Sequence, residues 1–115
     1  MKTILIIDQD RHAAHQLALT SLDRGIGAAL VETLCDGVRL LLTESVSLVV
    51  IESSLIRIGA RELAILLDRM APGVPVVVAT PSHCPLDVRV GWELAGLAVV
   101  SHPVLVEDLL KITAR

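Results

Sequence analysis

The most restrictive feature of this sequence is a short apolar run, Leu48-Val49-Val50-Ile51, which passes directly into the carboxylate Glu52. A continuous run of this length, rich in β-branched residues, is typical of a strand that is buried on both faces. Such strands form parallel sheets with helices on both sides. Open α/β sheets bind ligands outside the carboxyl ends of their strands. We therefore expect Glu52 to lie at the functional edge of a parallel sheet.

Similar apolar segments alternate with segments of helical periodicity along the whole chain. Strands are predicted over residues 4–7, 28–34, 48–52, 74–80 and 97–101, and helices over residues 11–22, 60–70, 86–95 and 104–113, with one more helix opening at Asp36-Gly37. This alternation predicts a doubly wound α/β fold with a five-stranded parallel sheet and right-handed crossovers. The expected strand order, 2-1-3-4-5, places the ends of the first and third strands side by side.

The composition fits a single domain, residues 1–115, with an aliphatic core. The chain is 53% hydrophobic but has one aromatic residue, Trp92, and a net charge of −3 without a basic run. Nucleic-acid binding is therefore disfavoured. We also expect no membrane partner, because no apolar run approaches the roughly 20 residues of a spanning helix. Cys35 and Cys84 lack metal-type spacing and disulfide density, which favours a cytoplasmic protein with free thiols.

The predicted sheet order brings several polar side chains to one edge. Asp8 and Glu52 end neighbouring strands, and Asp10 is expected to cap the first helix. Thr80 and His102 follow the fourth and fifth strands and should flank the carboxylates. Because carboxylate oxygens are ligands for divalent ions, Asp8 and Asp10 are candidates for a metal site, though weak ones.

In five ordered segments the chain resembles a response regulator receiver domain, the module that accepts a phosphoryl group from a histidine kinase. The matching segments are ILIIDQD, Asp36-Gly37, ESSLIRIGAREL beginning at Glu52, PVVVAT ending at Thr80, and Ser101-His102-Pro103. Each segment alone is unspecific, whereas the ordered set is fairly specific and spans nearly the whole chain. The resemblance implies a flavodoxin-like (βα)5 fold, a role in two-component phosphorelay signalling and a cis bond before Pro103.

Three of the five functional positions of the family differ in this sequence. Two acidic residues of the family help to hold Mg²⁺, an Asp is phosphorylated, a Thr or Ser holds a phosphoryl oxygen, and a Lys pairs with the phosphate. The matching residues in this chain are, in that order, Asp8 and Gln9, Glu52, Thr80 and His102. The differences are therefore Gln9 for an acid, Glu52 for the phosphoacceptor Asp, and His102 for the Lys.

A shifted alignment does not restore the usual site. No aspartate lies between Asp36 and Asp68, and Lys2 and Lys111 are the only lysines. Glu52 is one methylene longer than Asp, which displaces its carboxylate on the scale to which in-line transfer is sensitive. We therefore predict a pseudo-receiver that is not an enzyme, has no catalytic residue and no cofactor beyond weak Mg²⁺ binding. Glu52 would then be a permanent negative charge that pairs with His102 when the imidazole is protonated.

The resemblance also implies a partner face on the fourth helix, fifth strand and fifth helix. The strand position that carries a switching aromatic residue in the family is Val99 here, and Trp92 lies on or near this face. We expect a protein partner, an output domain or a homodimer to use it. The sequence leaves open whether the chain is free-standing or the front part of a longer regulator.

Two alternative functions remain open at this stage. One is a functional phosphoacceptor with a non-standard site. The other, weaker one is a small-molecule or metal sensor, which would show a cavity well beyond the carboxylate cluster. For a metal, His83 and Cys84 could join Glu52 and His102 around zinc, although their spacing is not a recognised zinc signature. His12 and His15 are expected to be surface residues.

Overall fold

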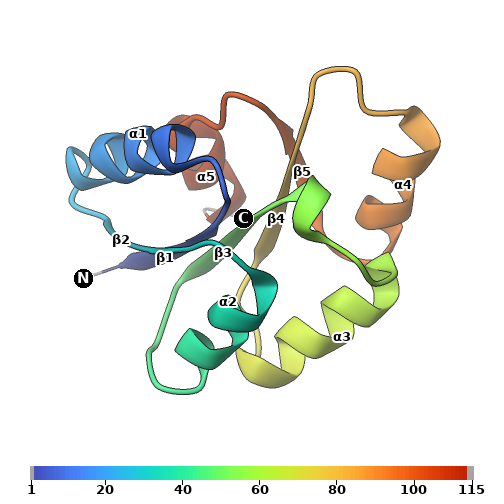
Figure 1. Ribbon diagram of the computed structural model, residues 1–115, viewed down its shortest axis with the longest axis horizontal. Helices are drawn as coiled ribbons and strands as arrows, with labels where there is room; N and C mark the ends of the chain where they lie inside the picture. The colour runs from blue at the N-terminus through green and yellow to red at the C-terminus, as the bar shows by residue number, and fades with distance from the viewer. Residues whose placement is uncertain (1, 114–115) are drawn as a thin grey trace.

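The computed structural model describes residues 2–113 and contains one five-stranded parallel sheet in the order β2-β1-β3-β4-β5 (Figure 1). The elements, in chain order, are β1 (Thr3–Ile7), α1 (Arg11–Leu22), β2 (Gly27–Val31), α2 (Leu34–Leu41), β3 (Leu48–Glu52), the 3-10 helix η1 (Ser53–Leu55), α3 (Ala60–Met70), β4 (Val76–Thr80), α4 (Leu86–Leu94), β5 (Ala98–Ser101) and α5 (Val106–Thr113). The predicted α/β class, strand order and alternation of elements are confirmed.

The parallel register aligns the carboxyl ends of the strands at one edge. Ile7 in β1 is paired with Ile51 in β3, and Glu52 is paired with Ala79 in β4. Asp8, which follows β1, and Glu52, which ends β3, therefore lie at the ends of neighbouring strands, as the strand order requires. The predicted site residues at or just beyond this edge are Asp8, Gln9, Asp10, Glu52, Thr80 and His102, whereas Val99 lies within β5 and Trp92 within α4.

Helices cover the sheet in two layers (Figure 1). Strand residues alternate between these layers because successive side chains of a strand point to opposite faces. Leu48 and Val50 pack with residues of α1 and α5, whereas Val49 and Ile51 pack with residues of α2 and α3. These four apolar side chains of β3 are at most 3% exposed. The run that predicted a strand buried on both faces is therefore the centre of two aliphatic cores.

The boundary between β2 and α2 differs from the prediction. β2 ends at Val31, not residue 34, and α2 begins at Leu34, before Asp36. The reason is Thr33, which is extended and accepts a hydrogen bond from the Asp36 N–H at 3.0 Å. This N-cap satisfies a donor of the first helical turn, so the chain leaves the sheet earlier than its apolar residues indicate.

Smaller differences occur at other element ends. β4 begins at Val76, two residues after the predicted start, and α5 begins at Val106 instead of residue 104. η1 follows β3 directly, within residues 53–59, for which neither a helix nor a strand is predicted. Both cysteines are free, with Cys35 exposed and Cys84 partly exposed. Within residues 2–113, no helix combines the length and the apolar character needed to cross a membrane.

Candidate functional site

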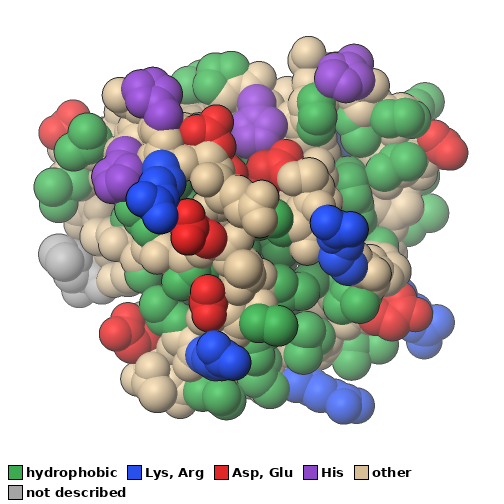
Figure 2. Space-filling view, in the orientation of Figure 1, with side chains coloured by type: hydrophobic (Ala, Val, Ile, Leu, Met, Phe, Trp, Pro, Cys, Tyr) green, Lys and Arg blue, Asp and Glu red, His purple; other side chains and the backbone are tan. Residues whose placement is uncertain are grey.

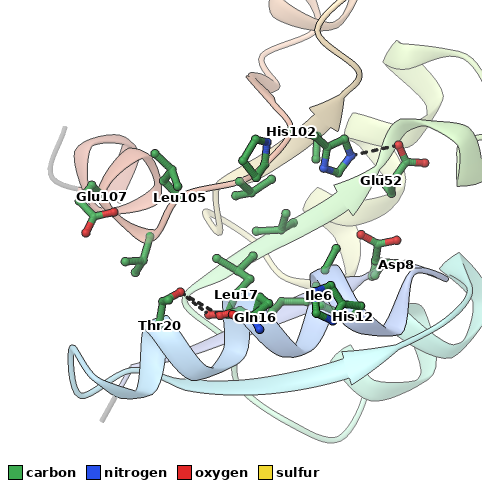
Figure 3. Close-up of a pocket in the computed structure, with 18 residues that line it drawn as sticks. Ile6, Asp8, His12, Gln16, Leu17, Thr20, Glu52, His102, Leu105 and Glu107 are labelled. Atoms are coloured by element: carbon green, nitrogen blue, oxygen red, sulfur yellow. Dashed lines mark hydrogen bonds and ion pairs between the residues drawn. The ribbon is translucent and has the colours of Figure 1, made fainter.

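Glu52 lies at the centre of the polar strand-end cluster. Its Oε2 atom accepts hydrogen bonds from the Ser54 N–H at 2.7 Å and from the Ser54 hydroxyl. Its Oε1 atom lies 3.3 Å from Nε2 of His102 (Figure 3). The same atom lies 3.4 Å from the Ser53 hydroxyl. The Glu52 side chain is only 15% exposed. Both carboxylate oxygens are thus held by donors of this chain, and the predicted pairing of Glu52 with His102 is confirmed in its geometry.

Asp8 and Asp10 use their carboxylates to organise the start of α1. Asp8 Oδ1 accepts a hydrogen bond from the Asp10 N–H at 2.9 Å. Asp10 Oδ1 accepts one from the Ala13 N–H at 3.1 Å, so the predicted N-cap is confirmed. Gln9, between them, is exposed. Asp8, Gln9, Asp10, Glu52 and His102 nevertheless line one open depression at the sheet edge.

The environment moves the pKa values of the two strand-end carboxyl groups in opposite directions. Burial raises the pKa of Asp8, the Asp10 N–H lowers it, and the charge of Glu52 raises it further, with a net increase. Burial also raises the pKa of Glu52, but hydrogen bonds from Ser54 and the contact with His102 outweigh burial, with a net decrease. The cluster therefore favours ionised Glu52 and disfavours ionised Asp8.

A magnesium ion, which the receiver resemblance implies, does not fit this donor set. Mg²⁺ requires near-octahedral oxygen coordination and prefers carboxylates. Here Gln9 is neutral, Asp10 caps α1, and both Glu52 oxygens already accept hydrogen bonds. Across residues 2–113, no group of three or more His, Cys, Asp and Glu side chains is arranged to hold a metal ion. The suggested zinc site of His83, Cys84, His102 and Glu52 is therefore not formed.

The side chains of Thr80 and Val99 do not make hydrogen bonds to the described residues of the cluster. Thr80 is 1% exposed, and its hydroxyl donates to the Val100 carbonyl oxygen in β5 at 3.4 Å. Val99 is partly buried and is paired with Val78 across the sheet. The bond between His102 and Pro103 is cis, as the resemblance implies.

Trp92, the predicted partner-face residue, is half-buried. It packs against the core cluster beneath α4, whereas the adjacent residues Gly91 and Glu93 are exposed. The exposed apolar side chains of α4 are Leu86, Val88, Val90 and Leu94, with exposed fractions from 40% to 83%. In the space-filling view, hydrophobic side chains accordingly gather over α4 at the right of the molecule (Figure 2).

A cavity of about 410 Å³ continues from the cluster into the space between α1 and the β5–α5 segment. Asp8, Glu52 and His102 point toward one another at one end, and Leu105 and Glu107 lie toward the other end (Figure 3). The floor is apolar and includes Ile6 and Val50. Such a cavity beyond the carboxylates was the expected sign of a ligand sensor.

Sequence reasoning missed two kinds of site residue. The first is Ser54, whose backbone and side chain both hold Glu52. A serine two residues after a strand-end carboxylate is a local signal for such a turn, because the carboxylate can cap it. The second is the set of α1 side chains that line the cavity, including His12 and Gln16. His12 and His15 are exposed, as predicted, yet His12 also borders the cavity.

Comparison with protein-family profiles and with curated proteins finds no match to this sequence. Solved structures are similar in fold. A CheY-like receiver domain from Methanospirillum hungatei is 23% identical with a TM-score of 0.80, and the match covers 99% of this chain and 91% of that chain. The NtrC4 receiver domain, solved as a beryllofluoride-activated dimer, is 17% identical with a TM-score of 0.83, covering 99% and 94%.

A response regulator from Burkholderia pseudomallei, solved with a phosphorylated aspartic acid, a calcium ion and citrate, is 21% identical with a TM-score of 0.81. That match covers 96% of this chain and 65% of the longer protein. At these identities the likeness concerns the backbone fold, and it agrees with the strand order of the sheet. The chain has the flavodoxin-like fold of response regulator receiver domains.

Proposed function

We propose that this chain is an atypical receiver that acts as a phosphorylation-independent protein-interaction module. The observation that carries the proposal is the environment of Glu52, which ends β3 with both carboxylate oxygens held by Ser54 and His102. In the family that this chain resembles, the matching position is a reactive Asp. A carboxylate already saturated with donors is a poor nucleophile and a stable anion. We infer a cytoplasmic, non-enzymatic role in two-component signalling.

The charge at Glu52 takes the place of a signal that other receivers gain by phosphorylation. Its contact with His102 connects β3 to the β5–α5 segment. Glu52→Ala removes this contact, and Glu52→Asp shortens the side chain so that it no longer reaches His102. Both variants are expected to change partner binding or oligomeric state. If both behave like the unmodified protein, the fixed-charge role is wrong.

The test of phosphorylation independence uses small phosphodonors. The protein is incubated with acetyl phosphate or beryllofluoride and Mg²⁺, and its intact mass and its NMR spectrum are recorded. We expect neither a gain of one phosphoryl group nor a change in the spectrum. Glu52→Asp combined with Gln9→Asp and His102→Lys is the matched control, since it restores the three differing positions. A phosphorylated unmodified chain would establish the rival function, a phosphoacceptor with a non-standard site.

The interaction face of the proposal is the exposed side of α4, β5 and α5, with a second copy of the chain as the partner. Leu86, Val90 and Leu94 are four residues apart and therefore share one side of α4. They are 74%, 40% and 83% exposed. Half-buried Trp92, on the same helix, would be covered further at its edge. Contiguous apolar side chains of this kind mark association surfaces.

Substitution on α4 tests this face. Leu86→Glu places a charge on the stripe, and an acid in the first helical turn does not weaken the helix. We expect the dimer dissociation constant from sedimentation analysis to rise at least about tenfold, since one buried apolar contact is commonly worth that much. Leu19→Glu on α1, where Leu19 is 57% exposed, is the matched control and should leave the dimer unchanged. A protein that stays monomeric at all concentrations excludes the homodimer.

A second candidate function, a small-molecule sensor at the strand-end pocket, is favoured by one observation. This observation is the cavity of about 410 Å³ that leads from Glu52 to α5. The volume falls within the roughly 300–1,000 Å³ typical of small-ligand sites. A ligand there would touch both His102 and the start of α5, and so could influence the proposed interaction face.

A further inference from the structure

We infer that the cavity between α1 and α5 binds an organic ammonium ion, with the cationic head on the Asp8 carboxylate, near the charge of Glu52, and the apolar body along the sheet. The inference rests on the second candidate function, the ligand sensor, and adds the chemical class of its ligand. It is independent of whether α4 mediates dimerisation. Three features of the cavity support it: the sign of its charges, the free hydrogen-bonding capacity at one end, and its apolar walls.

The charged residues that line the cavity are acidic. The eighteen lining residues include Asp8, Glu52 and Glu107 but no Lys or Arg. Glu107 is already paired with Arg24, whose Nη1 lies 3.2 Å from Oε1. The uncompensated negative charge therefore lies at the Asp8 and Glu52 end, and a ligand with an anionic head would be repelled there.

The two histidines that line the cavity do not reverse this polarity. His102 Nε2 donates to the ionised Glu52 Oε1 at 3.3 Å, and so belongs to the same hydrogen-bonded pair. His12 lies on the exposed side of α1. A protonated His102 would offset Glu52 but leave the charge of Asp8 unbalanced.

Asp8 offers the binding capacity that a cationic head requires. Among the described residues, the Asp10 N–H is the one hydrogen-bond donor to this carboxylate, and it occupies Oδ1. The Oδ2 atom remains able to accept. Burial and the nearby Glu52 charge both raise the pKa of Asp8, so the ionised form is disfavoured in the free protein. An ammonium group has three donors and a positive charge. It would therefore supply the hydrogen bonds that Asp8 loses on burial and offset the repulsion from Glu52.

The remainder of the cavity favours an apolar body over a bare metal ion. Its inner surface is formed by side chains of the sheet, α1 and the β5–α5 segment, among them Ile6, Leu17, Val50, Ala79 and Val106. These groups offer no oxygen ligands to a divalent ion, but they bury methylene or aryl groups favourably. Asp8 and Glu52 lie at one end, and Glu107 toward the other end is paired with Arg24, so the ligand carries its charge at one end of an apolar body.

The test compares three probes that share one apolar body: 3-phenylpropylammonium, 3-phenylpropan-1-ol and 3-phenylpropanoate. Each is titrated into the ¹⁵N-labelled full chain at neutral pH and low salt, and amide shifts are followed. We expect the amine to shift resonances of the first turns of α1 and of residues 102–106. The alcohol should bind about tenfold more weakly, because it lacks the charge-assisted hydrogen bond, and the carboxylate should not bind. Added salt should weaken amine binding alone.

Three variants locate the probe. Asp8→Asn keeps an acceptor for the Asp10 N–H but removes the charge, and should weaken amine binding about tenfold without affecting the alcohol. Glu44→Gln removes one exposed charge away from the cavity and should change neither. Ala13→Leu narrows the cavity from α1 and should weaken both amine and alcohol.

The outcomes separate the ligand class from the sensor function. If the alcohol or the carboxylate binds as tightly as the amine at the same resonances, the preference for an ammonium ion is wrong and the sensor function stands. If amine binding is unaffected by Asp8→Asn, the placement of the cationic head is wrong. If none of the three probes shifts a cavity resonance, both the inference and the sensor function are overturned, whereas the α4 interaction face is untouched.

Discussion

The residue at position 52 determines which contacts the carboxylate at the end of β3 makes. The Glu52 side chain reaches His102 across the edge of the sheet and folds back to Ser54 in the turn that follows β3. The same two contacts lower the pKa of Glu52 in spite of its burial. A group whose pKa is lower in the folded than in the unfolded protein stabilises the fold when ionised. Glu52 should therefore contribute to stability in a pH-dependent way.

Glu52→Gln tests this contribution. The stabilisation is fully present above the ordinary pKa of 4.5 and is lost as the pH falls through the lower folded value. At pH 7 we expect the variant to be less stable by about 0.5 kcal/mol. The difference is small because solvent screens the charge of Glu52 and because the substitution also removes the repulsion between Glu52 and Asp8. Urea unfolding from pH 7 to pH 3 measures the difference, which should shrink at the acid end.

Glu44→Gln is the matched control for this pH series. Glu44 is exposed, so its removal should leave the free energy of unfolding nearly constant relative to the unmodified protein. A Glu52→Gln variant that equals the unmodified protein at pH 7, or whose deficit grows in acid, would contradict the assigned direction of the Glu52 shift.

The sequence predicts the members of the cluster better than their contacts. Strand ends are set by strong apolar runs, so Asp8, Glu52 and His102 could be placed at one edge from the strand order alone. The direction of the Thr80 hydroxyl toward β5 depends on a side-chain rotamer and a neighbouring carbonyl group. The cavity depends on how far α1 stands from the β5–α5 segment, a tertiary distance that no local pattern encodes.

At the scale of elements, local hydrogen bonding decides boundaries that hydrophobicity leaves ambiguous. The apolar residues from Ala28 to Leu34 predict one long strand, but Thr33 caps a helix within that stretch. Capping competes with strand pairing because both satisfy backbone donors. The central strand had no such competitor, and β3 has the predicted bounds of residues 48–52.

The packing of α2 against β1 leads to a prediction at this scale. A Cβ atom at Gly37 would lie 2.6 Å from Cδ1 and 3.1 Å from Cγ1 of Ile7, which is fully buried. Gly37→Ala raises intrinsic helix propensity, yet we expect it to destabilise the protein by about 1–2 kcal/mol, because a close-packed core yields little room. The free energy of unfolding in urea is the measurement.

Gly91→Ala is the matched control within α4. A Cβ atom there has no neighbour within 4 Å, so only the helix propensity changes. We expect this variant to be more stable by about 0.5–1 kcal/mol. If the two alanine substitutions change stability in the same direction, α2 does not approach β1 as closely as the structure has it.

At the scale of the whole molecule, the two cores share the same strands. Val50 belongs to the core under α1 and α5, and its neighbours Val49 and Ile51 belong to the core under α2, α3 and α4. If a strand moves away from the helices on one face, its residues on the other face move as well. We therefore expect the domain to unfold in one cooperative step despite its two separate apolar clusters.

Trp92 makes this cooperativity measurable, because the single aromatic residue of the chain reports on one core only. Val50→Ala removes two methyl groups from the opposite core and should cost about 2 kcal/mol. If the cores are coupled, the urea midpoint from Trp92 fluorescence falls as far as the midpoint from far-ultraviolet circular dichroism. Val90→Ala on the exposed side of α4 should move both midpoints little, although it lies near Trp92 in sequence. A fluorescence midpoint that stays in place while the dichroism midpoint falls would mean that the two faces of the sheet unfold separately.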